Sequence, residues 1–192
     1  PMVNCLEDVD AALVLIKQAR NELVQEGVAL GTIPIGVMIE VPEALYQLEA
    51  LARRVDFLSI GSNDLTQYLL AVDRNNDRVE RWYRPFHPAV LQAIHSIAKA
   101  GQKYGLSVSI CGEVAGNPAM VILLLGMGID TLSLSAGDLS RVKMTVRALN
   151  LAQAQSILKQ ALTLEKTDAI ESMLERELIA LGLGGLIRPG SC

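Results

Sequence analysis

The 192-residue chain is acidic and half hydrophobic, with a formal net charge of −4, 51% apolar residues and 4% aromatic residues. At this length one domain is the default, and roughly two-thirds of the unfolded chain's surface can be buried without disulfide staples. Disordered, collagen-like and mini-protein chains are therefore excluded. The negative charge argues against a nucleic-acid partner, because phosphate binding needs a broad basic face. The longest apolar stretch, residues 119–129, is well short of the roughly 20 residues of a membrane span.

Cysteine usage points to a reducing compartment. Cys5, Cys111 and Cys192 form neither a Cys-x-x-Cys pair nor a spacing typical of zinc sites, so no disulfide or zinc framework is predicted. We predict a cytoplasmic protein. The chain starts with Pro1 and Met2 and has no charged segment followed by an apolar one, as a signal peptide would. We therefore expect a fragment of a longer polypeptide.

The first predicted elements alternate between helix and strand. Apolar residues at helical spacing predict a helix over residues 6–27, with Gly27 as its stop. Residues 33–39 form an almost continuous apolar run, typical of a strand buried on both faces. Proline at position 42 marks the start of a helix that we expect to continue to residue 54.

The alternation continues to the end of the chain. Asn117 followed by proline is typical of an N-cap, here for a helix that runs to residue 125. The other predicted elements, in chain order, are a strand over 55–60, helices over 64–72 and 88–104, strands over 107–111 and 131–134, and helical segments from 138, over 150–166 and over 168–181.

Repeated alternation of strand and helix requires parallel strands, because each crossover helix returns the chain to the same edge of the sheet. An open doubly wound sheet and a (β/α)8 barrel both satisfy this requirement, and a whole barrel needs about 250 residues. Polar residues gather just after the C-terminal ends of the strands, where barrel enzymes concentrate catalytic groups. We therefore predict an α/β fold, the C-terminal half of a (β/α)8 TIM barrel with about four parallel strands.

Two carboxylates follow neighbouring predicted strands. Glu40 and Asp64 end adjacent apolar runs, so in a parallel sheet both point into one shared mouth. Carboxylate oxygens suit Mg²⁺, which takes one or two protein carboxylates and completes its shell with water and substrate phosphate. The alternative is that Asp64 caps a helix and Glu40 is a solvated loop residue.

A phosphate site is a second interpretation of the same region. Asn63 and Asp64 stand at a helix start after Gly61, where free N–H groups and the helix dipole favour an anion, although an ordinary capping turn has the same pattern. Residues 74–84 hold four arginines among acidic residues, and one arginine can clamp a phosphate bidentately. The aromatic residues Trp82, Tyr83 and Phe86 more often anchor such a loop than contact a ligand. They could equally form a docking surface for another domain.

Cys111 ends an apolar strand and precedes a glycine, which leaves space beside the sulfur. A buried, inert thiol is the usual role of such a cysteine. A thiol with a pKa of about 8.5 is mostly protonated at neutral pH, however, so it can also act as a general acid. No histidine is near it in the sequence to form a nucleophilic pair.

Four separated motifs resemble the phosphoenolpyruvate-utilising enzymes. They are Gly-Val-Met-Ile-Glu-Val-Pro at 36–42, Ser-Ile-Gly-Ser-Asn-Asp-Leu-Thr-Gln-Tyr at 59–68, Ala-Val-Asp-Arg-Asn at 71–75 and Cys-Gly-Glu-Val-Ala-Gly at 111–116. The resemblance covers nearly the whole chain. The last two motifs look most like enzyme I, the phosphoenolpyruvate-protein phosphotransferase of the bacterial phosphotransferase system, and the nitrogen-related form is the specific expectation.

The resemblance implies that residues 1–192 are the C-terminal part of the phosphoenolpyruvate-binding barrel domain. It implies that Glu40 and Asp64 bind Mg²⁺ as cofactor, that Asn63, Asp64 and Arg74 contact the substrate, and that Cys111 protonates carbon 3 of the enolate. The phosphoryl group would pass to a histidine on a separate N-terminal domain and then to a carrier protein, HPr or its nitrogen-related counterpart, with release of pyruvate.

The resemblance also places the other substrate arginines and the acceptor histidine upstream. We therefore expect that the chain alone does not catalyse phosphoryl transfer. A half barrel has two unpaired strand edges, which predict a homodimer. Two alternatives stay open: the C-terminal domain of pyruvate phosphate dikinase or phosphoenolpyruvate synthase, and a catalytically silent binding or dimerisation module.

Overall fold

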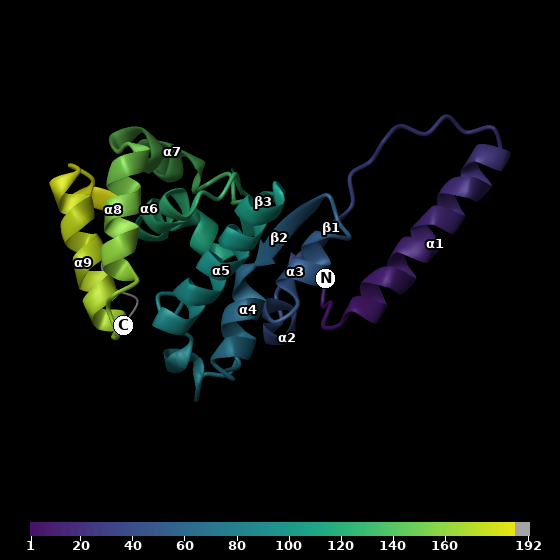
Figure 1. Cartoon of the computed structure of the whole chain (residues 1–192). Coiled ribbons are helices and arrows are strands. Elements are labelled where there is room, and N and C mark those ends of the chain that lie inside the picture. The colour runs from purple at the N-terminus through teal and green to yellow at the C-terminus, as the bar shows by residue number, and fades with distance from the viewer. Residues whose placement is uncertain (187–192) are drawn as a thin grey trace.

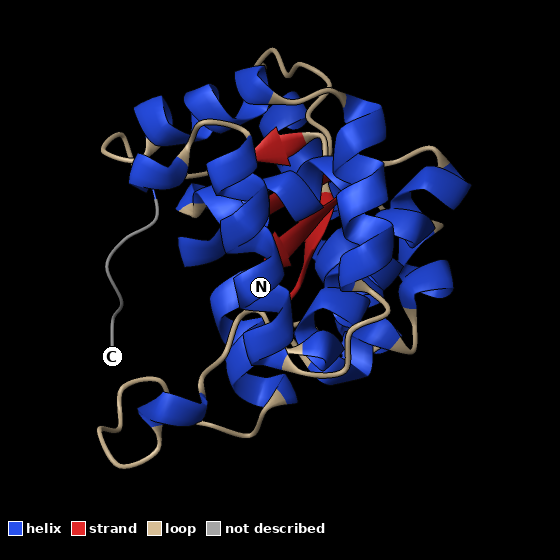
Figure 2. Cartoon of the chain, turned by 90° about the vertical axis from the view of Figure 1, so that its left-hand side faces the viewer, coloured by secondary structure: helices blue, strands red, loops and turns tan. Residues whose placement is uncertain are grey.

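Four short parallel strands form the centre of the fold, with helices around them (Figures 1 and 2). The computed structural model describes residues 1–186, and Cys192 lies outside them. The strands follow chain order, and each neighbouring pair is parallel. The predicted α/β class is confirmed, and the sheet is consistent with a partial (β/α)8 barrel. The strands are β1 (Gly36–Ile39), β2 (Phe57–Gly61), β3 (Ser107–Cys111) and β4 (Thr131–Leu132).

Helices connect the strands and continue after the last one. Within residues 1–186, no helix is both long enough and apolar enough for a membrane span. The α-helices are α1 (Leu6–Gln25), α2 (Pro42–Leu45), α3 (Leu48–Ala52), α4 (Ser62–Leu69), α5 (Pro88–Tyr104), α6 (Pro118–Met127), α7 (Leu139–Ala148), α8 (Leu151–Ala161) and α9 (Thr167–Ala180). The 3-10 helices are η1 (Glu80–Trp82), η2 (Glu113–Gly116) and η3 (Gly184–Leu186).

Local capping sets several helix ends where the sequence predicts them. The Asn117 side chain accepts hydrogen bonds from the N–H groups of Ala119 and Met120, which begins α6. Gly105 ends α5 in the left-handed region, with φ of 66°, where a residue without Cβ is favoured. Asn150 and Gln153 form a capping box that begins α8.

Three predicted elements are corrected by the structure. The helix expected over 42–54 is divided into α2 and α3, because the chain turns at Tyr46, whose side chain is 91% exposed. The strand expected over 33–39 begins at Gly36, where pairing with β2 starts. The helix expected over 150–166 ends at Ala161, since Leu164 turns back and donates to the Ala161 carbonyl.

The core lies on the sheet and under the helices that cover it. Ile39, Ile60 and Ile110 occupy one row of paired residues and are fully buried. Helix α6 is apolar on all sides, as expected for a helix with no face in water, and it packs against α7 and α8. Helices α8 and α9 both lie at the opposite end of the molecule from α1 (Figure 1).

The N-terminal helix is the exception to this packing. Helix α1 stands away from the sheet and returns to β1 through the long segment 26–35 (Figure 1). Val9 is its buried residue, whereas Val14 and Leu15 are each 65% exposed. An ion pair of 2.8 Å between Arg54 Nε and Asp10 Oδ1 joins the start of α1 to the end of α3.

Candidate functional site

The strand register brings the predicted polar residues to one edge of the sheet. Ile39 pairs with Ile60, and Ile60 pairs with Ile110. The next residue on each strand therefore lies at the same height in the sheet. These residues are Glu40 and the paired Gly61 and Cys111. The carboxyl ends of all these parallel strands open on one face, as the barrel prediction requires.

Glu40 is a buried carboxylate that leans over the end of the neighbouring strand. Its side chain is 4% exposed, and its Oε1 accepts a hydrogen bond of 2.6 Å from the Met2 N–H. A Cβ at Gly61 would lie 2.5 Å from Glu40 Oε2. Glycine at position 61 thus makes the space that the carboxylate occupies.

Asn63 joins the start of α4 to the loop that follows β3. Its Oδ1 accepts a hydrogen bond of 3.1 Å from the Glu113 N–H. Gly112 has φ of 91°, and a Cβ there would lie 2.6 Å from the same oxygen, so glycine is required by both conformation and space. With Oδ1 held in this way, the amide NH₂ of Asn63 is left as a donor. The site residues at this edge, Glu40, Asn63, Asp64, Arg74 and Cys111, are called the rim below.

Asp64 lies in the first turn of α4 and does not cap the helix, because the N-cap is Gly61 and no side chain caps it. The alternative interpretation of Asp64 as an N-cap is therefore wrong. Its Oδ1 lies 3.7 Å from Arg74 Nη2. Arg74 Nη1 is buried without a hydrogen-bond partner among the described residues. A buried guanidinium nitrogen without an acceptor is suited to bind an anion.

Cys111 is held at the rim by two contacts with β2 and α4. Its thiol donates to the Ile60 carbonyl at 3.5 Å, and the Ser62 hydroxyl donates to the Cys111 carbonyl at 2.6 Å. Burial raises the pKa of the Cys111 thiol above its usual value, and the charges of Glu40 and Asp64 raise it further. Both carboxylates are thus near enough to act on this sulfur, and the thiol stays protonated at neutral pH.

The donor set at the rim suits a hard cation. Within residues 1–186, no group of three or more His, Cys, Asp or Glu side chains gathers around one point. Glu40 and Asp64 supply only oxygen ligands, and Mg²⁺ characteristically uses one or two protein carboxylates. The two side chains therefore fit Mg²⁺ better than a metal that needs a full cage of protein ligands.

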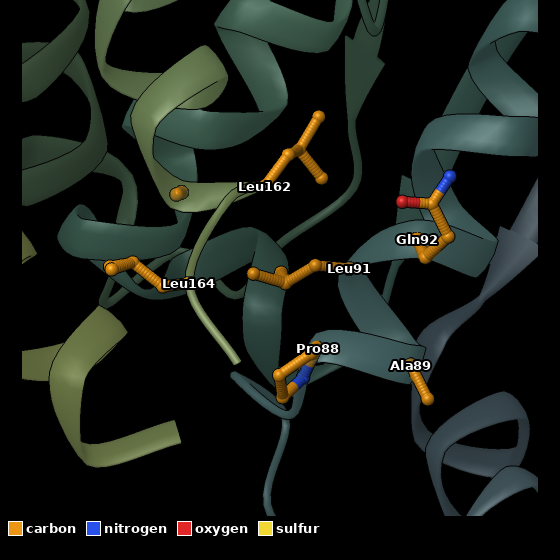
Figure 3. Close-up of a pocket in the computed structure, with 7 residues that line it drawn as sticks. Pro88, Ala89, Leu91, Gln92, Leu162 and Leu164 are labelled. Atoms are coloured by element: carbon orange, nitrogen blue, oxygen red, sulfur yellow. The ribbon is translucent and has the colours of Figure 1, made fainter. Parts of the chain in front are cut away.

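Two cavities lie away from this edge. One of about 290 Å³ is lined by apolar residues such as Leu91 on α5 and Leu162 and Leu164 after α8 (Figure 3). The other, of about 550 Å³, is lined by residues of α7 and by Leu183. The first has no titratable side chain in its lining, so it offers no chemistry of the kind found at the strand ends.

Sequence reasoning identified the rim but missed one residue that contacts it. The Tyr83 hydroxyl donates to the Asn63 carbonyl at 3.4 Å, across 20 positions of the chain. The sequence predicted that the aromatic residues near position 83 anchor a loop or dock another domain. His87 is structural, as its Nδ1 accepts from the Ala89 N–H at the start of α5.

Residues 1–151 match the family described as PEP-utilising enzyme, PEP-binding domain. The chain belongs to this family. The PEP-binding domain region contains all four strands and the five predicted site residues. The sequence-based resemblance is thereby confirmed at the level of the family, whereas the roles of the individual residues stay predictions.

Curated relatives carry phosphotransferase names. A "phosphoenolpyruvate-dependent phosphotransferase system" protein of Salmonella typhimurium is 41% identical over 191 residues, which are 99% of this chain and 26% of the relative. A phosphoenolpyruvate-protein phosphotransferase of Haemophilus influenzae is 38% identical over 180 residues, 93% of this chain and 31% of the relative. One of Priestia megaterium is 36% identical over 171 residues. The chain thus spans less than a third of these PEP-utilising relatives.

Proposed function

We propose that this chain is the phosphoenolpyruvate-binding part of a phosphotransferase that moves the phosphoryl group from phosphoenolpyruvate to a protein histidine and releases pyruvate. The observation that carries the proposal is the convergence of Glu40, Asp64 and Cys111 on one edge of the sheet, with Arg74 beside Asp64. The phosphotransferase names of the relatives favour this function over the dikinase, synthase and silent-module alternatives.

The rim residues match the chemical needs of the reaction. Departure of the phosphoryl group from phosphoenolpyruvate leaves an enolate, which needs positive charge near its oxygen and a proton donor at carbon 3. Glu40 and Asp64 would hold Mg²⁺, which would supply Lewis-acid stabilisation of the oxygens. Arg74 Nη1, which has no hydrogen-bond partner in the described part of the chain, and the Asn63 NH₂ group would bind the phosphoryl oxygens.

Cys111 is the proposed acid. Its S–H bond would break as the proton moves to carbon 3 of the enolate, which gives pyruvate and a thiolate that regains a proton from water. The burial and the two nearby carboxylates that raise its pKa keep the thiol protonated before the transfer and make the thiolate a strong base afterward. The same environment would make the residue a poor nucleophile.

The test compares two free cysteines in the full-length protein. We expect Cys111→Ala to lower pyruvate formation by about 10² to 10⁴-fold, the usual contribution of general acid catalysis. Cys5→Ala is the matched control, because Cys5 precedes α1 and is also a free thiol. Pyruvate formation that is unchanged in Cys111→Ala would favour a silent module or another acid.

Further parts of the proposal concern the whole protein. We propose that the acceptor histidine and further substrate arginines lie upstream, that the chain alone does not transfer phosphate, and that onward transfer goes to HPr or its nitrogen-related counterpart in the cytoplasm. We propose the nitrogen-related form, which a transfer assay with both carriers tests directly. The unpaired edges of β1 and β4 support a homodimer, and sedimentation as a monomer would contradict it.

A further inference from the structure

Tyr83 lies between the loop that carries Arg74 and the first turn of α4. It follows η1 and precedes α5, so it belongs to the same long connection as Arg74. Its hydroxyl donates to the Asn63 carbonyl at 3.4 Å. This hydrogen bond is part-buried, whereas the neighbouring Trp82 side chain is 54% exposed. Tyr83 therefore points inward toward the site while its neighbour points to solvent.

Two further side chains surround the same hydroxyl. Burial raises the pKa of Tyr83 and the Glu113 charge raises it further, whereas the nearby Arg74 and Thr66 side chains oppose the rise. Thr66 Oγ1 and Arg74 Nη1 are both buried without a hydrogen-bond partner in residues 1–186. Tyr83 thus lies close to buried polar atoms of both α4 and the Arg74 loop, which are also joined by the bond of 3.2 Å from the Arg74 N–H to Gln67 Oε1 on α4.

We propose that Tyr83 is a positioning residue, whose hydroxyl holds the Asn63 backbone and the Arg74 guanidinium in the arrangement that binds the phosphoryl group. The inference rests on the proposed function of the rim. Arg74 is separated from Asn63 by the rest of α4, and its ion pair with Asp64 spans 3.7 Å, which is long for a strong contact. The Arg74 backbone is fixed by the bond of 3.2 Å from its N–H to Gln67 Oε1, so the place of the guanidinium depends on the side chains beside it.

The neighbouring residue fixes the other side of the same loop. Arg84 Nη2 lies 2.5 Å from Asp168 and 2.8 Å from Glu171, both on α9. Position 83 is therefore held at the site while position 84 is held by the C-terminal helices. The Arg84 ion pairs are partly exposed and contribute little to stability. We therefore expect loss of the Tyr83 hydroxyl to change the phosphoryl-binding residues more than loss of these pairs.

The test removes that hydroxyl alone in the full-length protein. We expect Tyr83→Phe to raise Kd and KM for phosphoenolpyruvate in the presence of Mg²⁺ about fivefold, the effect of one lost hydrogen bond, with kcat changed less than KM. Tyr46→Phe is the matched control, because Tyr46 is 91% exposed. A double variant with Arg74→Lys should lose less than the sum of the two single changes, since both act through one guanidinium.

A second readout follows Arg74 without any substrate. In ¹⁵N NMR spectra, the Arg74 Nε–H signal should shift or broaden in Tyr83→Phe and stay in place in Tyr46→Phe. Tyr83→Phe that keeps both the affinity and the Arg74 signal of the unaltered protein would overturn the positioning role alone. Failure of the unaltered protein to bind phosphoenolpyruvate would overturn the proposed function together with it.

Discussion

The sheet and the N-terminal helix both contain apolar residues at regular spacing, but these residues are buried in the sheet and largely exposed on the helix. In the sheet, Leu58 and Ile60 are fully buried, and the residues paired with them on β1 and β3 are also buried and apolar. On α1, Val14 and Leu15 are 65% exposed. Apolar residues at helical spacing predicted a helix in this region, and a helix is what the structure has.

The difference shows what apolar periodicity determines. It sets the type of an element, because a repeat at helical spacing places one stripe of side chains on one face. It does not determine what packs against that stripe. The apolar residues of α5 and α6 are buried against other parts of this chain, whereas α1 contacts the rest of the fold mainly through α3. Stability and mobility should therefore differ between the two regions.

The largest expected effect is on the sheet side of this comparison. We expect Leu58→Ala to lower the free energy of unfolding by about 3 kcal/mol, since it leaves a cavity in a fully buried site. The same truncation at Leu15 on α1 should change it by less than about 0.5 kcal/mol. Urea unfolding monitored by circular dichroism measures both. Equal losses for the two variants would show that α1 is covered in solution.

A second prediction compares the free cysteine before α1 with the one at the rim. Because Glu40 raises the pKa of Cys111, Glu40→Gln should speed alkylation of Cys111 by iodoacetamide at pH 8, as only the thiolate reacts. Alkylation of Cys5 should not change, since the acidic groups that act on it are Asp8 and Glu7. Mass spectrometry of the two peptides measures both rates in one sample.

The same raised pKa has a consequence for stability. The folded Cys111 thiol keeps its proton to higher pH than the unfolded one, so its contribution is complete below about pH 8.5 and is lost as pH rises through the folded pKa. Unfolding experiments at pH 8 and pH 10 should show a smaller loss in Cys111→Ser than in the unaltered protein. An identical loss would mean that folding does not raise the pKa of this thiol.

The rim illustrates how far sequence reasoning reaches. Glu40, Asp64 and Cys111 follow apolar strands, and parallel pairing brings strand ends together, so their proximity was predictable. The Tyr83 contact with Asn63 was not, because it depends on the path of a long loop with no regular periodicity. The turn at Tyr46 was missed for a related reason, since helix propensity continues through it and the packing around α3 decides it.

The smallest expected effect concerns the attachment of α1 to the body. Asp10 and Arg54 form an ion pair whose side chains are 54% and 33% exposed, so its loss should cost at most about 0.5 kcal/mol of global stability. The local effect should be larger, because this pair joins α1 to the end of α3. In Asp10→Asn, the amides of α1 should exchange with solvent faster while those of α5 keep their rates.

Glu22→Gln is the control for that experiment, because it makes the same charge change on α1 and its contact is with Gln18 in the same helix. Added salt should narrow the difference between Asp10→Asn and the unaltered protein, since partly exposed pairs are screened. If both variants leave α1 exchange unchanged, the attachment resides instead in the buried Val9 and in the Gln47 side-chain bond of 2.9 Å to the Asn4 carbonyl. Val9→Ala would then be the substitution that frees the helix.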